Sequence, residues 1–152
     1  MQAGSSAHEL ALRLLARREH ACGELTRKLQ QRGVAREQAA ETIAELSAQG
    51  WQSDARFAEQ FAQDHAARGD GPLKIRAALQ ARGVAETVIA ETLRELGVDW
   101  LASACTARRK RFGDELPCGA AEQMRQQRFL LARGFTSQHA RAALRANSLN
   151  DD

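Results

Sequence analysis

A short segment that ends just past a glycine occurs three times along this 152-residue chain. Residues 25–34 (Leu-Thr-Arg-Lys-Leu-Gln-Gln-Arg-Gly-Val) match residues 75–84 (Ile-Arg-Ala-Ala-Leu-Gln-Ala-Arg-Gly-Val), and residues 129–135 match both more weakly. The shared glycines lie 50 and 51 residues apart, at Gly33, Gly83 and Gly134. Repeats of this length are typical of tandem helical modules, which bury their apolar faces against their neighbours. The repeat therefore predicts three similar units.

Each repeat glycine is expected to end a helix. A residue just past the last helical turn often adopts a left-handed conformation, which costs a residue other than glycine about 1–2 kcal/mol. In the Schellman arrangement, the residue after the glycine contacts a residue in the last turn of the helix. The predicted contacts are Val34 with Leu29, Val84 with Leu79, and Phe135 with Leu130.

The residues between the glycines favour helices over strands. Ala, Leu, Glu, Gln and Arg dominate, Tyr is absent and only two prolines occur. We expect an all-α fold of three tandem three-helix repeats, at 8–50, 51–97 and 98–147, which form an elongated, curved, right-handed helical array. The predicted helices are 8–19, 23–32 and 36–48, then 54–68, 72–82 and 86–96, then 98–112, 119–133 and 137–146. Trp51 and Trp100 fall at matching joints between repeats and are expected to be packing residues.

No pattern of catalytic residues emerges. The chain has no phosphate-binding glycine loop, nucleophile elbow or zinc-binding His-Glu-x-x-His helix. Its three cysteines and four histidines are scattered, so neither a metal nor another cofactor is expected. No apolar run is long enough to span a bilayer, and no signal peptide is visible. We expect a cytoplasmic protein that is not an enzyme.

Positive charge gathers near the C-terminal end. Residues 101–150 contain nine basic and three acidic residues, whereas residues 51–100 contain six basic and eight acidic residues. Such a concentration favours contact with phosphates or with acidic protein, although a solvated helix surface is the simpler alternative. For Arg82 and Arg133, which precede repeat glycines, a cation that stabilises the helix dipole is another explanation. The candidate contact residues are Arg68, Lys74, Arg76, Arg82, Arg108, Arg109, Lys110, Arg111, Arg125, Arg128 and Arg133.

The central repeat resembles a known family. Residues 54–61 (Asp-Ala-Arg-Phe-Ala-Glu-Gln-Phe) and 68–84 (from Arg-Gly-Asp-Gly-Pro-Leu-Lys-Ile to Arg-Gly-Val) are similar to the central signature of RecX regulatory proteins. Residues 11–18 and 24–29 resemble that family's opening repeat, and the likeness extends from about residue 7 to residue 146. It implies three three-helix modules and a monomer that binds the RecA filament on single-stranded DNA. It also implies inhibition of RecA's ATPase, strand-exchange and co-protease activities, and leaves open direct contact with DNA.

Two other classes of function stay open. A DNA-binding protein with helix-turn-helix-like units, acting independently of RecA, would explain the basic third repeat and would bind DNA with a steep salt dependence. A helical scaffold for other proteins would explain the repeats alone and would bind neither RecA nor DNA. In neither case do we expect contact with a membrane.

Overall fold

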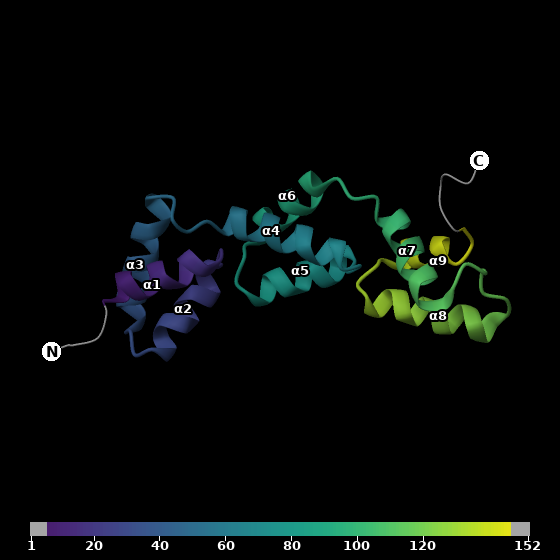
Figure 1. Ribbon diagram of the computed structural model, residues 1–152, viewed down its shortest axis with the longest axis horizontal. Coiled ribbons are helices and arrows are strands. Elements are labelled where there is room, and N and C mark those ends of the chain that lie inside the picture. The colour runs from purple at the N-terminus through teal and green to yellow at the C-terminus, as the bar shows by residue number, and fades with distance from the viewer. Residues whose placement is uncertain (1–5, 147–152) are drawn as a thin grey trace. The chain divides into compact units, whose positions relative to one another are not determined.

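The computed structural model describes residues 6–146, and within that range it contains nine helices and no strands (Figure 1). The prediction of an all-α chain with three helices per repeat is confirmed. The helices are α1 (Ala7–Arg17), α2 (Cys22–Gln31), α3 (Arg36–Ala48), α4 (Asp54–Ala67), α5 (Pro72–Ala81), α6 (Glu86–Leu96), α7 (Trp100–Phe112), α8 (Ala120–Ala132) and α9 (Ser137–Ala143). Six helices end before the predicted residue, four of them by a single residue. The larger differences are at α1, where the backbone is already extended at Arg18, and at α9, which ends at Ala143 instead of residue 146.

The chain divides into two compact units. The described part of unit 1 comprises residues 6–60 and 79–92, and that of unit 2 comprises residues 61–78 and 93–146. Unit 1 therefore contains the first repeat with one end of the second. Unit 2 contains the other end of the second repeat with the whole of the third.

The apolar core of unit 1 is formed by one face of each of its first three helices. Ala11 and Leu14 of α1, Leu25 and Leu29 of α2, and Ala39, Ile43 and Leu46 of α3 pack together and are buried. These residues recur at intervals of three or four, so they occupy one face of each amphipathic helix. No single helix could keep such a face out of water, and the three helices are therefore stable only as a group.

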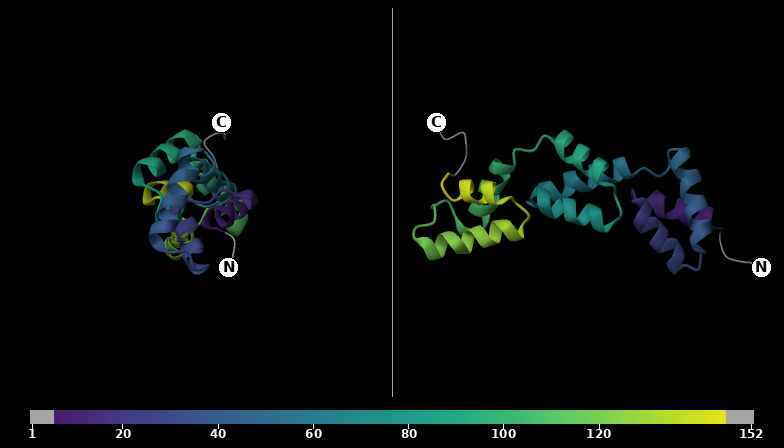
Figure 2. Two further views of the ribbon diagram at one scale, coloured as in Figure 1. Left: turned by 90° about the vertical axis from the view of Figure 1, so that its left-hand side faces the viewer. Right: turned by 180° about the vertical axis from the view of Figure 1, so that it is seen from behind.

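Unit 2 has a comparable core at its C-terminal end. Helices α7, α8 and α9 contact one another, and two further views in Figure 2 show this group. Ala104, Cys105, Leu130, Phe135 and Ala140 are at most 1% exposed in its centre. Phe135 takes the place that Val34 and Val84 have in the other repeats, so a large ring fills a core lined by several alanines.

The predicted Schellman caps are present in all three repeats. The backbone N–H groups of Val34, Val84 and Phe135 donate to the carbonyl oxygens of Leu29, Leu79 and Leu130, respectively, at 3.0, 3.1 and 3.2 Å. The glycines before them have φ of +90°, +82° and +95°. Two further caps of this kind, at Gly50 and Gly69, end α3 and α4. These two caps were not predicted, because Gly50 and Gly69 lie outside the segment that is repeated around Gly33, Gly83 and Gly134.

Gly83 and Gly134 each lie against the middle helix of the repeat before them. Gly83 lies against the first turn of α2, and Gly134 lies against the first turn of α5. In unit 1, a Cβ atom placed on Gly23 of α2 would lie 2.5 Å from the carbonyl oxygen of Arg82. In unit 2, the N–H groups of Gly71 and Leu73, at the start of α5, donate to Arg133 O and Gly134 O at 2.7 and 2.9 Å. The first turn of a helix leaves its N–H groups without partners in that helix, and the last turn leaves its carbonyl groups without them. Here the first turn of one helix meets the end of another, so the two sets of groups face each other.

The two tryptophans do not occupy equivalent places, so the prediction that both are packing residues is wrong for Trp51. Trp100 is the first residue of α7, after the N-cap Asp99, and packs against the core of the third repeat. Trp51 follows the Gly50 turn, three residues before α4 begins, and is 61% exposed.

We expect Gly134→Ala to be more destabilising than Gly33→Ala, although both residues occupy the same cap. Each substitution incurs the left-handed strain of about 1–2 kcal/mol. At Gly33 an added Cβ meets nothing within 4 Å, whereas at Gly134 it would lie 2.6 Å from the backbone nitrogen of Lys74. Urea unfolding of both variants measures the difference. Equal losses in the free energy of unfolding would show that the backbone of the second repeat leaves room for a Cβ atom at residue 134 of the third.

Candidate functional site

The last turn of α7 carries four consecutive basic residues, and their side chains point in different directions. Arg108 is buried, Arg109 is half-buried, and Lys110 and Arg111 are exposed. Successive helical residues are rotated by about 100° from one another, so a run of four must place at least one side chain toward the core. The cations in this turn also stabilise the C-terminal end of the helix dipole.

Arg108 is a core residue, so its selection as a contact candidate is corrected. Its side chain is 0% exposed, and Nη1 donates to the carbonyl oxygens of Gly113 and Glu115 at 3.3 and 3.0 Å. Burial lowers its pKa from the usual value. The guanidinium thus fixes the loop that follows α7. The sequence could not show which member of the basic run faces inward, because this depends on the helix's rotation about its axis.

Four of the other candidates line one groove in unit 2. They are Arg68, at the end of α4, Lys110 and Arg111 of α7, and Arg133, which follows α8. The groove has a volume of about 580 Å³, and Ser103, Thr106 and Phe129 also line it. None of its lining residues is a carboxylate. We call this the basic groove; its cations and hydroxyl groups suit an anionic ligand.

Aromatic rings support the cations around the basic groove. Phe112 and Phe129 pack edge to face with their centroids 5.3 Å apart. The guanidinium groups of Arg111 and Arg125 lie over Phe112 at 5.5 and 5.0 Å, and that of Arg133 lies over Phe129 at 5.8 Å. Such cation–π contacts hold a charge in place without neutralising it. Neither phenylalanine was among the candidates predicted from the sequence, although each lies close to the basic residues in the sequence.

The remaining candidates lie outside the basic groove. Lys74 forms an ion pair with Asp70 at 3.3 Å, and Arg125 forms one with Glu122 at 3.2 Å. Arg128 is exposed on α8, and Arg76 is half-buried on α5. Arg82 belongs to unit 1, whereas every other candidate belongs to unit 2.

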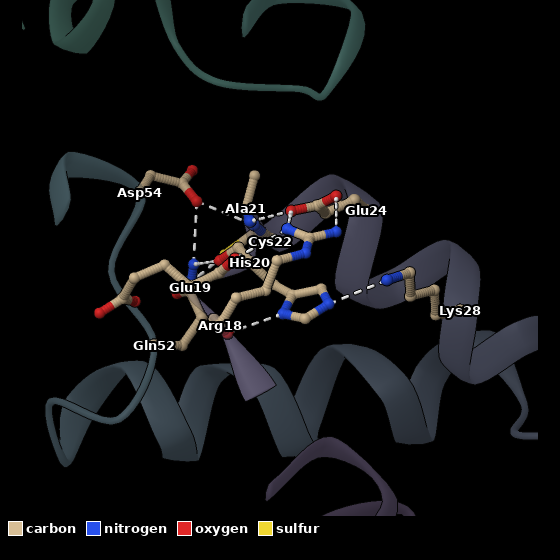
Figure 3. Close-up of polar contacts among 9 residues, drawn as sticks. All are labelled: Arg18, Glu19, His20, Ala21, Cys22, Glu24, Lys28, Gln52 and Asp54. Carbon is tan, nitrogen blue, oxygen red and sulfur yellow. Dashed lines mark hydrogen bonds and ion pairs between the residues drawn. The ribbon is translucent and has the colours of Figure 1, made fainter. Parts of the chain in front are cut away.

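A second polar cluster lies in unit 1, where α1, α2 and the segment before α4 meet (Figure 3). Arg18 makes two hydrogen bonds to the carboxylate of Glu24, at 2.9 and 3.1 Å, and Glu24 accepts a third from the N–H of Ala21. Burial by itself would raise the pKa of Glu24, but these hydrogen bonds outweigh it and hold the pKa below its usual value. Glu24 thereby joins α1 to the start of α2.

His20 is the most deeply buried member of this cluster, at 1% exposure. Its Nδ1 lies 3.0 Å from the carbonyl oxygen of Arg18, and its Nε2 lies 2.9 Å from Nζ of Lys28. A neutral imidazole satisfies both contacts if Nδ1 carries the proton and Nε2 accepts from the lysine. Burial lowers the pKa of His20, and the nearby Arg18 and Lys28 lower it further.

Side chains from the second repeat complete the cluster. Gln52, which is 3% exposed, donates to His20 O at 3.1 Å, and Asp54 accepts from the N–H of Cys22 at 2.8 Å. The Cys22 thiol donates to Gln52 at 3.2 Å, and burial raises its pKa. Every polar group has a partner within the cluster, so its role is to join the first two repeats.

Neither a metal-binding cluster nor a membrane-spanning helix occurs within residues 6–146. No group of three or more His, Cys, Asp or Glu side chains in this range could hold a metal ion. None of the helices described there is long and apolar enough to cross a membrane. Cys22, Cys105 and Cys118 form no disulfide bond.

Comparison with known families gives three matches, one for each repeat. Residues 7–46, 53–93 and 98–144 match the models described as the first, second and third three-helix domains of RecX. A regulatory protein RecX from Halorhodospira halophila is 42% identical over 150 residues, covering 99% of this chain and 93% of that protein. One from Chromohalobacter salexigens is 44% identical over 134 residues, covering 88% of each chain.

The fold also resembles solved structures. A crystal structure of RecX from Lactobacillus salivarius superposes with a TM-score of 0.78 at 18% identity, covering 93% of this chain and 94% of that one. A second crystal structure, of a regulatory protein RecX, gives a TM-score of 0.72 at 19% identity and covers 88% of this chain and 67% of the other.

We expect the stability of the chain to fall as the pH drops from 7.5 to 5.5, and His20 to account for part of the loss. An unfolded histidine binds a proton near pH 6.5, to within about one unit. The lowered pKa of folded His20 opposes that protonation, so the unfolded state binds more protons and stability declines as the pH falls through that value. Urea unfolding at both pH values measures the change in the wild-type chain and in His20→Gln. An equally steep decline in His20→Gln would contradict this role for His20.

Proposed function

Because this chain belongs to the RecX family of regulatory proteins, we propose that it binds the RecA recombinase filament and inhibits it. The family domains follow one another over most of the chain, and the chain's relatives are regulatory proteins, not enzymes. The activities inhibited would be the ATPase, strand exchange and co-protease functions of RecA. In the cytoplasm, the chain would thereby regulate recombination and DNA repair, and with them the SOS response.

The observation that carries this proposal is the basic groove. The described part of unit 2 has 13 basic and seven acidic residues, whereas that of unit 1 has nine and ten. A filament on single-stranded DNA offers both phosphates and acidic protein side chains to such a surface. We propose that the chain acts as a monomer, with the basic groove drawing it to the filament and the other repeats contacting neighbouring RecA subunits.

Direct DNA binding independent of RecA is a second candidate function. The position of Phe129 among the cations of the basic groove favours it, since single-stranded nucleic acids bind to basic surfaces that also present aromatic rings. This candidate requires strong binding to bare DNA, with a steep dependence on salt concentration. The RecA proposal requires tighter binding to the RecA–DNA filament than to the same DNA without RecA.

We expect the chain to slow the single-stranded-DNA-dependent ATPase of RecA at amounts well below one molecule per RecA subunit. One bound molecule would obstruct a filament in which many subunits act together. A titration of the chain against a fixed RecA concentration measures this. Inhibition only near equal amounts would instead indicate sequestration of free RecA, and no inhibition would contradict the proposal.

Charge reversal in the basic groove should weaken filament binding severely. The triple variant Arg68→Glu, Lys110→Glu and Arg111→Glu changes exposed side chains and leaves the buried Arg108 in place. Each exposed substitution should alter the free energy of unfolding by no more than about 0.5 kcal/mol. Binding to RecA–DNA filaments, measured by fluorescence anisotropy at low and high salt, should also lose most of its salt dependence.

The matched control is Arg13→Glu, Arg27→Glu and Arg36→Glu, which makes the same change in charge on exposed residues of the first repeat. We expect this control to bind nearly as tightly as the wild-type chain. If both triple variants weakened binding equally, net charge alone would explain the effect and the basic groove would have no special part in it.

A further inference from the structure

The third repeat leaves open a surface that is covered in the first two. In α2 and α5, the first turn lies against the glycine turn of the following repeat, at Gly23 and Leu73. The spacing of the repeat glycines places Met124 of α8 at the corresponding position. Met124 is 52% exposed, so no glycine turn within residues 6–146 covers this position in the third repeat.

Helix α8 is also longer at this end. It begins 14 residues before its repeat glycine, whereas α2 and α5 begin 11 residues before theirs. The extra residues continue the helix through the position where a following repeat would dock.

This open surface is both apolar and basic. Met124 and Leu131, which is 40% exposed, lie on the same side of α8 because seven residues make nearly two helical turns. Beside Met124 is a hollow of about 250 Å³, which is also lined by Leu144, Arg141 and Arg145. None of its lining residues is acidic. We call Met124, Leu131, Arg141, Leu144 and Arg145 the terminal face.

We propose that the terminal face binds an acidic amphipathic segment of a partner protein. An apolar side chain of that segment would enter the hollow against Met124, and its carboxylates would pair with Arg141 and Arg145. Methionine suits such a contact because its flexible thioether adapts to the side chain that it meets. The inference rests on the proposed function, since it takes the partner to be the protein component of the RecA filament.

A second copy of this chain fits the terminal face less well. If two copies met in the way that neighbouring repeats meet, the turn at Gly33 of the second copy would take this position, because an added Cβ at Gly33 meets nothing within 4 Å. That turn carries Arg32 and Arg36, both exposed, and would place them near Arg141 and Arg145. Like charges at close range oppose such contact. Charge complementarity therefore favours an acidic partner.

The apolar side chains also distinguish this surface from the basic groove. Met124 and Leu131 offer neither charge nor hydrogen bonds to a phosphate, and the lining of the hollow includes no aromatic ring on which a base could stack. The basic groove has four cations, two hydroxyl groups and a phenylalanine. Two surfaces of unit 2 thus fit two different ligands.

The test compares Met124→Gln/Leu131→Gln with the wild-type chain. Glutamine has a helix propensity close to those of methionine and leucine, so α8 should persist, and circular dichroism checks that it does. Binding is measured to RecA filaments on single-stranded DNA and, separately, to the same DNA without RecA. We expect filament binding to weaken about tenfold or more, which corresponds to about 1.4 kcal/mol, with bare-DNA binding unchanged.

Two controls sharpen the result. Trp51→Gln removes a larger exposed apolar side chain from the first repeat and should leave filament binding unchanged. Removing residues 147–152, which include Asp151 and Asp152, tests whether the chain's own acidic residues occupy the terminal face. Equal filament binding with and without them supports a separate partner.

Several results would overturn the proposal. They are unchanged filament binding by the double variant, an equal loss with Trp51→Gln, an equal loss of bare-DNA binding, and much tighter filament binding after removal of residues 147–152. Self-association of the wild-type chain that the double variant abolishes, seen in analytical ultracentrifugation, would assign the terminal face to a second copy. If the wild-type chain itself did not bind the filament, the proposed function would fail first, so the two failures are distinguishable.

Discussion

The structure depends on the meeting of helix ends where one repeat adjoins the next. At the start of α5, the N–H groups of Gly71 and Leu73 donate to the carbonyl groups at the end of α8. Each group would otherwise need water or a capping side chain, because the first and last turns of a helix leave their backbone groups without partners. Backbone atoms can approach so closely only where no Cβ intervenes. An added Cβ at Gly71 would lie 2.5 Å from Gly134 O, and one at Gly23 would lie 2.5 Å from Arg82 O.

A cluster of polar side chains, of which His20, Glu24 and Gln52 are buried, adds a second connection between repeats in unit 1. Arg18, Glu24, His20 and Lys28 satisfy one another, and Gln52 and Asp54 extend the cluster into the second repeat. Partners matter here because a buried polar group without a hydrogen bond costs about 1–3 kcal/mol. A smaller cluster in unit 2 lies within the second repeat, where Asp70 accepts from His65 at 2.8 Å and pairs with Lys74. Hydrogen bonds from His65 and Lys74 overcome the effect of burial and lower the pKa of Asp70.

The basic residues of the third repeat serve different purposes despite their similar chemistry. Arg108 fixes a loop from within the core, and Arg133 donates to Arg68 O at 2.8 Å while its guanidinium also borders the basic groove. Lys110 and Arg111 are exposed, so they are available to a ligand. Part of the charge on this repeat is therefore structural, and only the remainder is exposed to a ligand. A count of arginines and lysines overstates that remainder.

By itself, the sequence determined the helices, the three caps and the concentration of charge. Those features depend on local properties, namely helix propensity, the left-handed conformation that glycine adopts, and the repeat spacing. Only the tertiary structure decided that Arg108 is buried, that Trp51 is exposed, and that Arg68, Lys110, Arg111 and Arg133 share a groove with Phe129. The physical reason is that burial depends on how each helix is rotated and on what packs against it, and residues 68 and 133 meet only because separate helix ends dock together.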